Sequence, residues 1–371
     1  MTGAGPRHVL MTTDAVGGVW TYALDLAAGL LARQVAVTLV VLGPGPRPGQ
    51  RRAAAQIEGL TVVETGLPLD WTAADAGAVA LAARGVAALA DRSGADLIHL
   101  NSPALAAEGR FAAPVVGACH SCLGSWWGAV RGEEPMPESF RWRTEILARG
   151  YAACDRLVAP TRAFSDTTAD LYGVAPQAVH NGRSAPLASD PRPRNPVVMT
   201  SGRLWDDGKN VRTLDRAAAR MRGQVHAAGA LKGPDNQVAA FEHILCLGQL
   251  ESGVLADRLE RSAVFASLSL YEPFGLGVLE AAQAGCALVL SDIPTFRELW
   301  QDAAVFVPAE DDAAVAEALD NLLDDPGRTA ALGGAARERS ARFTVDAMVE
   351  GTLAVYGDAL AARAVCPEVA A

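Results

Sequence analysis

Two glutamates frame a short turn in the C-terminal half of the chain. Glu272 and Glu280 lie eight positions apart, and the residues after Glu272 read Pro-Phe-Gly-Leu-Gly. The apolar run 262–270 before them predicts a buried strand, and residues 278–284 predict a helix. A strand that ends in a Pro/Gly turn and opens a helix is where open α/β sheets bind ligands, because helix N-terminal N–H groups point outward there. Each carboxylate could accept hydrogen bonds from sugar hydroxyls. The alternative is that Glu272 caps the helix and Glu280 is a solvated helix residue. For two glutamates considered alone, this alternative is favoured.

Two cations frame a polar loop, 202–210, further upstream. Arg203 and Lys209 stand beside the predicted start of a helix, where they would suit an anion such as a diphosphate. The alternative is an exposed loop in which Asp206 and Asp207 pair with these cations locally. The same two aspartates could suggest a metal site, but Arg203 and Lys209 already supply the positive charge that a metal would bring. We therefore expect no metal here.

Three further candidates follow predicted strands of the N-terminal half. Gly17 and Gly18 could bring backbone N–H groups to a phosphate, or could form a tight turn that needs a positive φ. They lack the G-x-G-x-x-G spacing of dinucleotide sites. His120 could take a polar role at a cleft edge or be a locally satisfied loop histidine. Its neighbours Cys119 and Cys122 form a C-x-x-C without a second ligand pair, which favours structural cysteines over zinc ligands.

Length and composition indicate what kind of molecule positions these residues. The chain has 371 residues, half of them hydrophobic, which predicts two ordinary domains with sizeable cores. The net charge of −10 without a basic block argues against a nucleic-acid partner. We expect neither a signal peptide nor a membrane span. The six cysteines lie mostly in apolar contexts, which favours reduced thiols and a cytoplasmic protein.

Strands alternate with helices along both halves, and this pattern predicts parallel sheets covered on both faces. The strands are expected at 8–13, 35–42, 60–64, 96–100, 115–119, 156–159, 175–180, 196–200, 224–228, 244–247, 262–270, 287–290 and 305–307. The helices are expected at 20–33, 72–92, 104–108, 138–153, 161–172, 210–221, 235–242, 252–261, 278–284, 294–300, 311–323, 327–342 and 345–362, and a Pro/Gly loop at 43–49.

A proline-rich stretch divides the two halves. We predict an N-terminal Rossmann-like domain over 1–185, a linker over 186–194 and a C-terminal Rossmann-like domain over 195–344. The last helix, within 345–371, is expected to join the N-terminal domain. The fold class is thus α/β, with two doubly wound domains facing each other across a cleft.

Together these motifs resemble the retaining GT-B glycosyltransferases of family 4, also called glycosyl transferases group 1. The stretch from Glu272 to Glu280 is similar to that family's E-x7-E signature, and Gly202 to Asn210 is similar to its G-R-x5-K-[GN] loop. Gly17-Gly18, His120 and the Asn-Gly pair before the linker match weaker marks of the family. The resemblance covers nearly the whole chain.

The resemblance implies a role for each matching residue. Arg203 and Lys209 would neutralise the diphosphate leaving group, and Glu272 would hold hydroxyls of the transferred sugar. His120 would contact that sugar near its anomeric centre, and Glu280 would accept from the ribose hydroxyls. The remaining donor contacts would come from the backbone of Gly17, Gly18, Phe274, Gly275 and Leu276.

The reaction implied is transfer from a UDP- or GDP-sugar to an acceptor hydroxyl, with retention and without a metal or other cofactor. The acceptor could be a saccharide, a lipid-linked molecule or a small molecule. A weak basic-aromatic patch, made of Arg141, Trp142, Arg143 and Arg149, leaves peripheral contact with the inner membrane face open, although a solvated helix face is favoured. The alternatives are a GT-B sugar-nucleotide epimerase and a catalytically silent sugar-nucleotide-binding protein.

Overall fold

A computed structural model gives the fold and describes residues 5–184, 193–233 and 237–365. These residues form two compact units. Unit 1 runs to Gly182 and resumes at Val345, and unit 2 spans Arg183–Thr344. Apart from residues 193 and 194, the predicted linker 186–194 lies outside the described residues.

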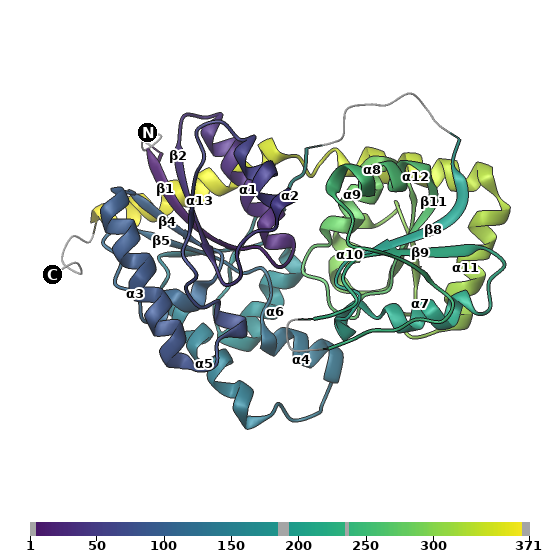
Figure 1. The fold of residues 1–371 in the computed structure, drawn as a ribbon, viewed down its shortest axis with the longest axis horizontal. Helices are drawn as coiled ribbons and strands as arrows, with labels where there is room; N and C mark the ends of the chain where they lie inside the picture. The colour runs from purple at the N-terminus through teal and green to yellow at the C-terminus, as the bar shows by residue number, and fades with distance from the viewer. Residues whose placement is uncertain (1–4, 185–192, 234–236, 366–371) are drawn as a thin grey trace. The chain divides into compact units, whose positions relative to one another are not determined.

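Unit 1 is built on a seven-stranded parallel sheet (Figure 1). Its strands are β1 (His8–Asp14), β2 (Ala36–Leu42), β3 (Thr61–Glu64), β4 (Leu97–Leu100), β5 (Val115–Ala118), β6 (Arg156–Ala159) and β7 (Gln177–Ala178). Its helices are α1 (Gly18–Leu31), α2 (Pro48–Ala55), α3 (Ala76–Ser93), α4 (Leu123–Arg131), α5 (Glu138–Ala153), α6 (Arg162–Tyr172) and α13 (Val345–Val365), with 3₁₀ turns η1 (Asp70–Thr72) and η2 (Pro103–Ala107).

The last helix, α13, completes the core of unit 1. Leu26 and Leu30 of α1 are fully buried, as are Val349 and Tyr356 of α13, and all four belong to one hydrophobic cluster. A Cβ atom placed on Gly29 would lie 2.5 Å from Val349 Cγ2, so the glycine lets the two helices approach closely. Unit 1 therefore depends on a segment that follows the whole of unit 2 in the sequence.

Unit 2 is built on a six-stranded parallel sheet. Its strands are β8 (Asn195–Ser201), β9 (Gln224–Ala228), β10 (Leu245–Gly248), β11 (Ser262–Ser267), β12 (Ala287–Ser291) and β13 (Val305–Val307). Its helices are α7 (Val211–Ala218), α8 (Ser252–Arg261), α9 (Leu276–Ala284), α10 (Pro294–Trp300), α11 (Asp312–Asp324) and α12 (Pro326–Ser340), with the 3₁₀ turn η3 (Asp207–Lys209).

The central strands of unit 2 are apolar at nearly every position because helices cover both faces of the sheet. Consecutive residues of β11 show this directly. Val264 packs into one hydrophobic cluster and Phe265 into another, and both are buried. In β12, Val289 and Leu290 divide between the same two clusters. The continuous apolar runs in the sequence thus follow from two cores, one on each face.

Both sheets are doubly wound, as predicted. The strand orders are β3-β2-β1-β4-β5-β6-β7 and β10-β9-β8-β11-β12-β13. In each unit the direction of winding reverses beside the first strand, between β1 and β4 and between β8 and β11. Connections leave such a pair of strands toward opposite sides, which opens a crevice at their carboxyl ends where ligands bind. The loops after these four strands are therefore the places to look for a site.

Two elements differ from their predictions, one in unit 2 and one at the edge of the sheet of unit 1. The helix expected at 235–242 is absent from the described part of that range. Lys232 and Val238 instead pair as an antiparallel bridge, and the Asp215 carboxylate accepts the N–H groups of residues 242–244. The strand expected at 175–180 forms only over Gln177–Ala178.

Other differences lie in unit 1. The structure has α2, which starts inside the loop expected at 43–49, and α4, which no pattern indicated. Pro48 occupies the first turn of α2, a position that proline favours. The Cys122 thiol caps α4 by accepting from the Ser125 N–H, a role that sequence rules assign to Ser, Thr, Asp or Asn. The helix expected at 104–108 forms as the 3₁₀ turn η2.

Candidate active site

The two charged motifs of unit 2 meet at the carboxyl ends of β8 and β11. Lys209 ends η3, the turn after β8, and Glu272 follows β11. The Lys209 ammonium donates to the Glu272 carboxylate in an ion pair that is mostly buried. The N–H groups of Leu270 and Tyr271 also donate to the Gly208 carbonyl, at 2.9 and 3.3 Å. The switch point of the sheet thus brings together the cation and the carboxylate that the sequence placed 63 residues apart.

Local hydrogen bonds shape the loop that carries the cations. One oxygen of Asp206 accepts from the Gly208 N–H at 2.9 Å, and the other accepts from Arg203 Nε and Nη2 at 3.2 and 2.9 Å. Asn210 adopts a positive φ of 51° and donates to the Leu268 carbonyl at 3.1 Å, which ties the loop to the end of β11. The local pairing of Arg203 with an aspartate is therefore present.

A glycine in the left-handed region begins α9. Gly275 has a φ of 92°, and a Cβ atom there would lie 3.1 Å from a ring carbon of Phe296. No side chain caps α9, so Glu272 is not the helix cap that one alternative expected. The first N–H groups of a helix lack intrahelical partners and carry the positive end of its dipole. Leu276 begins the helix, and Phe274 just before it is buried.

Glu280, in the second turn of α9, is not a solvated helix residue. Its carboxylate forms an ion pair with Arg183 at 2.9 Å, and both side chains are largely buried. Arg183 is fixed in turn by its backbone, whose N–H donates to the Phe343 carbonyl at 3.1 Å and whose carbonyl accepts from Gln283 Nε2 at 3.1 Å. Sequence reasoning did not predict Arg183 as a partner of Glu280, because nothing local connects residues so far apart.

In unit 1, Gly17 and Gly18 begin α1 directly after β1. Gly17 is the N-cap residue with a φ of −138°, an extended value open to any residue, and Gly18 is the first helical residue. The turn therefore does not need a positive φ, contrary to one of the two interpretations of these glycines. Asp14, at the end of β1, orders the turn by accepting the Val16 N–H at 2.7 Å. Neither glycine has a side chain that could cap the N-terminus of α1.

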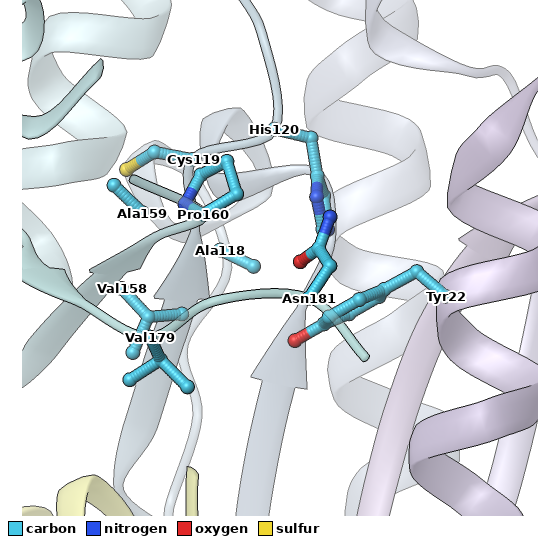
Figure 2. Close-up of a pocket in the computed structure, with 9 residues that line it drawn as sticks. All are labelled: Tyr22, Ala118, Cys119, His120, Val158, Ala159, Pro160, Val179 and Asn181. Atoms are coloured by element: carbon cyan, nitrogen blue, oxygen red, sulfur yellow. The ribbon is translucent and has the colours of Figure 1, made fainter. Parts of the chain in front are cut away.

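His120 lines a small pocket at the carboxyl ends of β5 and β6 (Figure 2). Tyr22, His120 and Asn181 bring polar groups to it. The Tyr22 and His120 rings pack edge to face, with their centroids 4.5 Å apart. The other lining residues are Ala118, Cys119, Val158, Ala159, Pro160 and Val179.

Asn101 connects His120 to a second, fully buried histidine. Its Oδ1 lies 2.6 Å from His120 Nε2 and 3.1 Å from His99 Nε2. Burial lowers the pKa of His120 to about 3, with His99 contributing, and burial lowers the pKa of His99 to about 4. Both imidazoles are therefore neutral around neutral pH.

An acidic group lies near the same edge of the sheet in unit 1. Asp70 accepts a hydrogen bond from Ser102 Oγ at 3.1 Å. Burial raises the pKa of Asp70 to about 6, and the nearby Asp14 carboxylate adds to the shift. Sequence reasoning missed Asp70, Asn101 and Tyr22. Only Asn101 had a usable signal, since Asn-Ser-Pro directly follows a predicted strand.

The arginines of the basic-aromatic patch are engaged within unit 1. Arg143 lies over the Trp142 ring at 4.5 Å and donates to the Ala73 carbonyl at 2.8 Å. Arg141 pairs with Glu138 at 3.2 Å, and Arg149 pairs with Glu108 at 2.9 Å. Among the helices that the structure describes, none is long and apolar enough to cross a membrane. The described residues also hold no cluster of three metal-ligating side chains of the His, Cys, Asp or Glu type.

Two doubly wound units, with cations and carboxylates gathered at a switch point, form an α/β protein with a candidate anion-binding site. Comparison with known families agrees. Residues 16–184 match the model of Glycosyltransferase Family 4, and residues 195–325 match the model of Glycosyl transferases group 1. The chain belongs to this family, and it is a glycosyltransferase.

Relatives and solved structures support this assignment. The chain is 28% identical to a D-inositol 3-phosphate glycosyltransferase of Stackebrandtia nassauensis, over 98% of this chain and 94% of the relative. It is also 28% identical to an alpha-maltose-1-phosphate synthase of Mycolicibacterium smegmatis, over 58% of this chain and 69% of the relative.

Two solved structures share the GT-B fold, which confirms the predicted fold class. Sucrose-phosphate synthase from Thermosynechococcus elongatus superposes with a TM-score of 0.78 at 18% identity, covering 96% of this chain and 100% of that one. Anabaena Alr3699/HepE, solved in complex with UDP-glucose, gives a TM-score of 0.72 at 18% identity, covering 94% and 98%.

Proposed function

We propose that this glycosyltransferase moves a sugar from a nucleoside diphosphate donor, a UDP- or GDP-sugar, to an acceptor hydroxyl. The proposal includes retention of the anomeric configuration and a reaction without a metal. The observation that carries it is the Lys209–Glu272 ion pair beside the N-terminus of α9 in unit 2. Anabaena Alr3699/HepE, which shares the fold, was solved in complex with UDP-glucose and adds support for the donor class.

The chemistry of glycosyl transfer suits this ion pair. As the bond between sugar and diphosphate breaks, negative charge grows on the diphosphate and positive charge grows on the sugar ring. Lys209 and the N–H groups at the start of α9 would stabilise the leaving group, while Glu272 would hold the sugar hydroxyls. Because each side chain holds the other in position before a donor arrives, little reorganisation is needed when it binds.

The remaining candidates take supporting roles in this proposal. Arg203 would add positive charge at the diphosphate, although its pairing with Asp206 means that it acts as part of a fixed pair. Glu280 would accept from the ribose hydroxyls. Gly17 and Gly18 would present backbone N–H groups to phosphate oxygens, and His120 would contact the donor sugar.

In this proposal retention follows from attack on the same face of the sugar and needs no enzyme nucleophile. The acceptor hydroxyl attacks on the face that the diphosphate leaves, and its proton passes to the departing phosphate oxygen. The bond between the sugar and the acceptor oxygen forms as the bond to phosphate breaks, so the anomeric configuration is kept in a single step. Fixed cations would take the place of a divalent ion at the leaving group.

The test is incubation of the full chain with a panel of UDP- and GDP-sugars and hydroxylated acceptors, with and without EDTA. We expect release of one nucleotide, an unchanged rate in EDTA, and a product whose anomeric configuration matches that of the donor by NMR. Inverted product would contradict retention, and EDTA-sensitive activity restored by Mg²⁺ would contradict the metal-free reaction. Conversion of the donor to its epimer, or tight nucleotide binding without release from any donor, would overturn the proposed transfer.

A cytoplasmic location is part of the proposal. Its support is that none of the five cysteines that the structure describes forms a disulfide, which is typical of a reducing compartment. Fractionation of cells that produce the protein would test it, since recovery with the membrane fraction after a high-salt wash would contradict a free cytoplasmic enzyme.

A further inference from the structure

Asn101 accepts from two histidines at once, and its own orientation is fixed from the other side. Its Nδ2 donates to the Thr12 carbonyl at 2.7 Å, and its backbone N–H donates to Thr12 Oγ1 at 2.9 Å. Rotating the amide by 180° would bring two oxygens to that 2.7 Å separation, which is repulsive. The Oδ1 atom must therefore face His99 and His120.

An amide oxygen can only accept hydrogen bonds, so both imidazoles must donate from Nε2. Asn101 Oδ1 lies 3.1 Å from His99 Nε2 and 2.6 Å from His120 Nε2, and its two lone pairs serve one ring each. A neutral imidazole carries one hydrogen, so Nδ1 of both rings holds a lone pair. The tautomer of each histidine follows from the chemistry of its partner.

The other ring nitrogen of His99, Nδ1, has a partner that can donate a hydrogen bond to it. Tyr356 Oη lies 2.9 Å from His99 Nδ1, and because that nitrogen can only accept, the phenol donates. Tyr356 and His99 are both fully buried, so neither can exchange its partner for water. The chain of hydrogen bonds runs from Tyr356 of α13, through His99 of β4 and Asn101, to His120.

The titratable groups around the two rings are neutral. Tyr22 of α1 packs against His120, Cys119 precedes it, and Tyr356 reaches His99 from α13. Burial raises the pKa of each of these three groups above its ordinary value. None of them therefore supplies a charge that would favour an imidazolium.

We propose that Asn101 is a positioning residue that holds His120 in its Nε2–H tautomer, with Tyr356 and His99 as the buried anchor of the arrangement. His120, which lines the pocket of unit 1, thereby keeps Nδ1 as its hydrogen-bond acceptor. The group that it would recognise is a hydroxyl, which donates, and not a phosphate or carboxylate oxygen, which cannot. That this hydroxyl belongs to a donor sugar rests on the function proposed above, whereas the tautomer does not depend on it.

The first test reads the tautomer directly in the free, full-length protein. Long-range ¹H–¹⁵N spectra of histidine-labelled protein distinguish protonated from unprotonated ring nitrogens, and a His120→Gln variant assigns the signals. We expect His120 to show Nε2 protonated and Nδ1 unprotonated throughout pH 5.5–8, without titration. A protonated Nδ1, a mixture of tautomers or a titration within that range would each overturn the proposal.

The second test removes the fixing groups one at a time. Asn101→Ala should release His120 into a mixture of tautomers, whereas Tyr356→Phe should leave both rings protonated at Nε2, because Asn101 Oδ1 still accepts from each of them. Thr38→Val is the matched control, because it deletes the 2.9 Å partner of His8 elsewhere in the same sheet and should leave both signals unchanged. A single Nε2–H tautomer of His120 in Asn101→Ala, in a variant that retains the wild-type circular dichroism, would contradict the role of Asn101.

The third test is a pH profile of the transfer reaction with the donor identified by the panel. Asn101→Ala should lower kcat by about 10²-fold, as for a misplaced reacting group. Asn101→Asp places a carboxylate against both imidazoles and raises their pKa values. Its kcat should therefore rise with pH through a step between pH 5 and 8 that the wild type lacks. A uniform loss at every pH would reveal a merely structural role for Asn101. If no donor is turned over, the proposed function fails while the spectra still decide the tautomer.

Discussion

The cations proposed to face the leaving group are each held by a carboxylate in unit 2. Lys209 pairs with Glu272, and Arg203 pairs with Asp206. Such pairs lower the desolvation cost of keeping a cation in a partly buried site. A donor would enter an arrangement in which charge is already balanced and the side chains are already in position.

The role of Lys209 is tested by Lys209→Ala. Removing one fixed electrostatic stabiliser of the leaving group should lower kcat by about 10²-fold or more, measured as nucleotide release. Lys232→Ala is the matched control, since Lys232 is an exposed lysine of the same unit. Unchanged kcat in Lys209→Ala would contradict its role at the leaving group.

Asp70 gives a prediction about stability. Because burial raises its pKa from 3.8 to about 6, the folded protein holds this proton more tightly than the unfolded chain. Its contribution to stability is therefore fully present below about pH 4, and is lost as the pH rises through about 6. Above that pH the ionised, buried carboxylate destabilises the fold.

Asp70→Asn should accordingly stabilise the protein at high pH. We expect the free energy of unfolding to rise by about 1–2 kcal/mol at pH 7.5, after allowance for partial solvent screening. The gain should disappear near pH 4, because the wild-type carboxyl is then neutral as well. Urea denaturation at both values checks this, and an equal gain at both would show that the charge is not the cause.

Among the elements, α9 shows how far local sequence reaches. The Pro/Gly turn, the helix after it and the strand before it all follow from neighbouring residues, and the structure contains all three. The partners of its glutamates do not follow. Arg183 lies nearly a hundred residues before Glu280, and their contact depends on a sheet that neither residue encodes.

The same limit explains the network around His120. The sequence indicates that His120 follows a strand, but Tyr356 reaches His99 across 257 positions. The wrong prediction of a helix at 235–242 has the same cause. Ala239, Ala240 and Glu242 favour a helix, yet the carboxylate of Asp215, from α7, accepts the N–H groups of residues 242–244. Tertiary contacts override local preference in both cases.

The start of α9 is tested by Gly275→Ala. A residue other than glycine is strained at a φ of 92°, and the added Cβ would lie 3.1 Å from Phe296. We expect a loss of about 1–3 kcal/mol in the free energy of unfolding, together with weaker donor binding. Gly253→Ala, early in α8 with nothing within 4 Å of its Cβ position, is the control and should not destabilise. A Gly275→Ala protein as stable as the control would contradict the strain argument.

At the scale of the whole molecule, α13 determines whether unit 1 can fold. Met348, Val349, Val355, Tyr356 and Ala359 are all buried in the core of that unit. Their burial is worth on the order of 10 kcal/mol, which is comparable with the total stability of a domain.

Deleting residues 345–371 should therefore abolish the cooperative unfolding of unit 1, while unit 2 keeps its own core. Thermal unfolding by circular dichroism checks this, with the fragment 183–344 as the reference for unit 2. The truncated chain should show the single transition of that fragment and no other. A second transition assignable to unit 1 would show that α13 is dispensable.

The path of the chain also sets an order of events during synthesis. The ribosome releases the seven strands of unit 1 first, then every residue of unit 2, and only then α13. At 5–20 residues per second, unit 1 waits on the order of ten seconds or longer between its last strand and the helix that covers its core. Unit 2, although second in the sequence, is the first to be completed. The hydrogen-bonded link from Tyr356 to His120 can form only after α13 has emerged from the ribosome, so the nascent chain lacks this link until then.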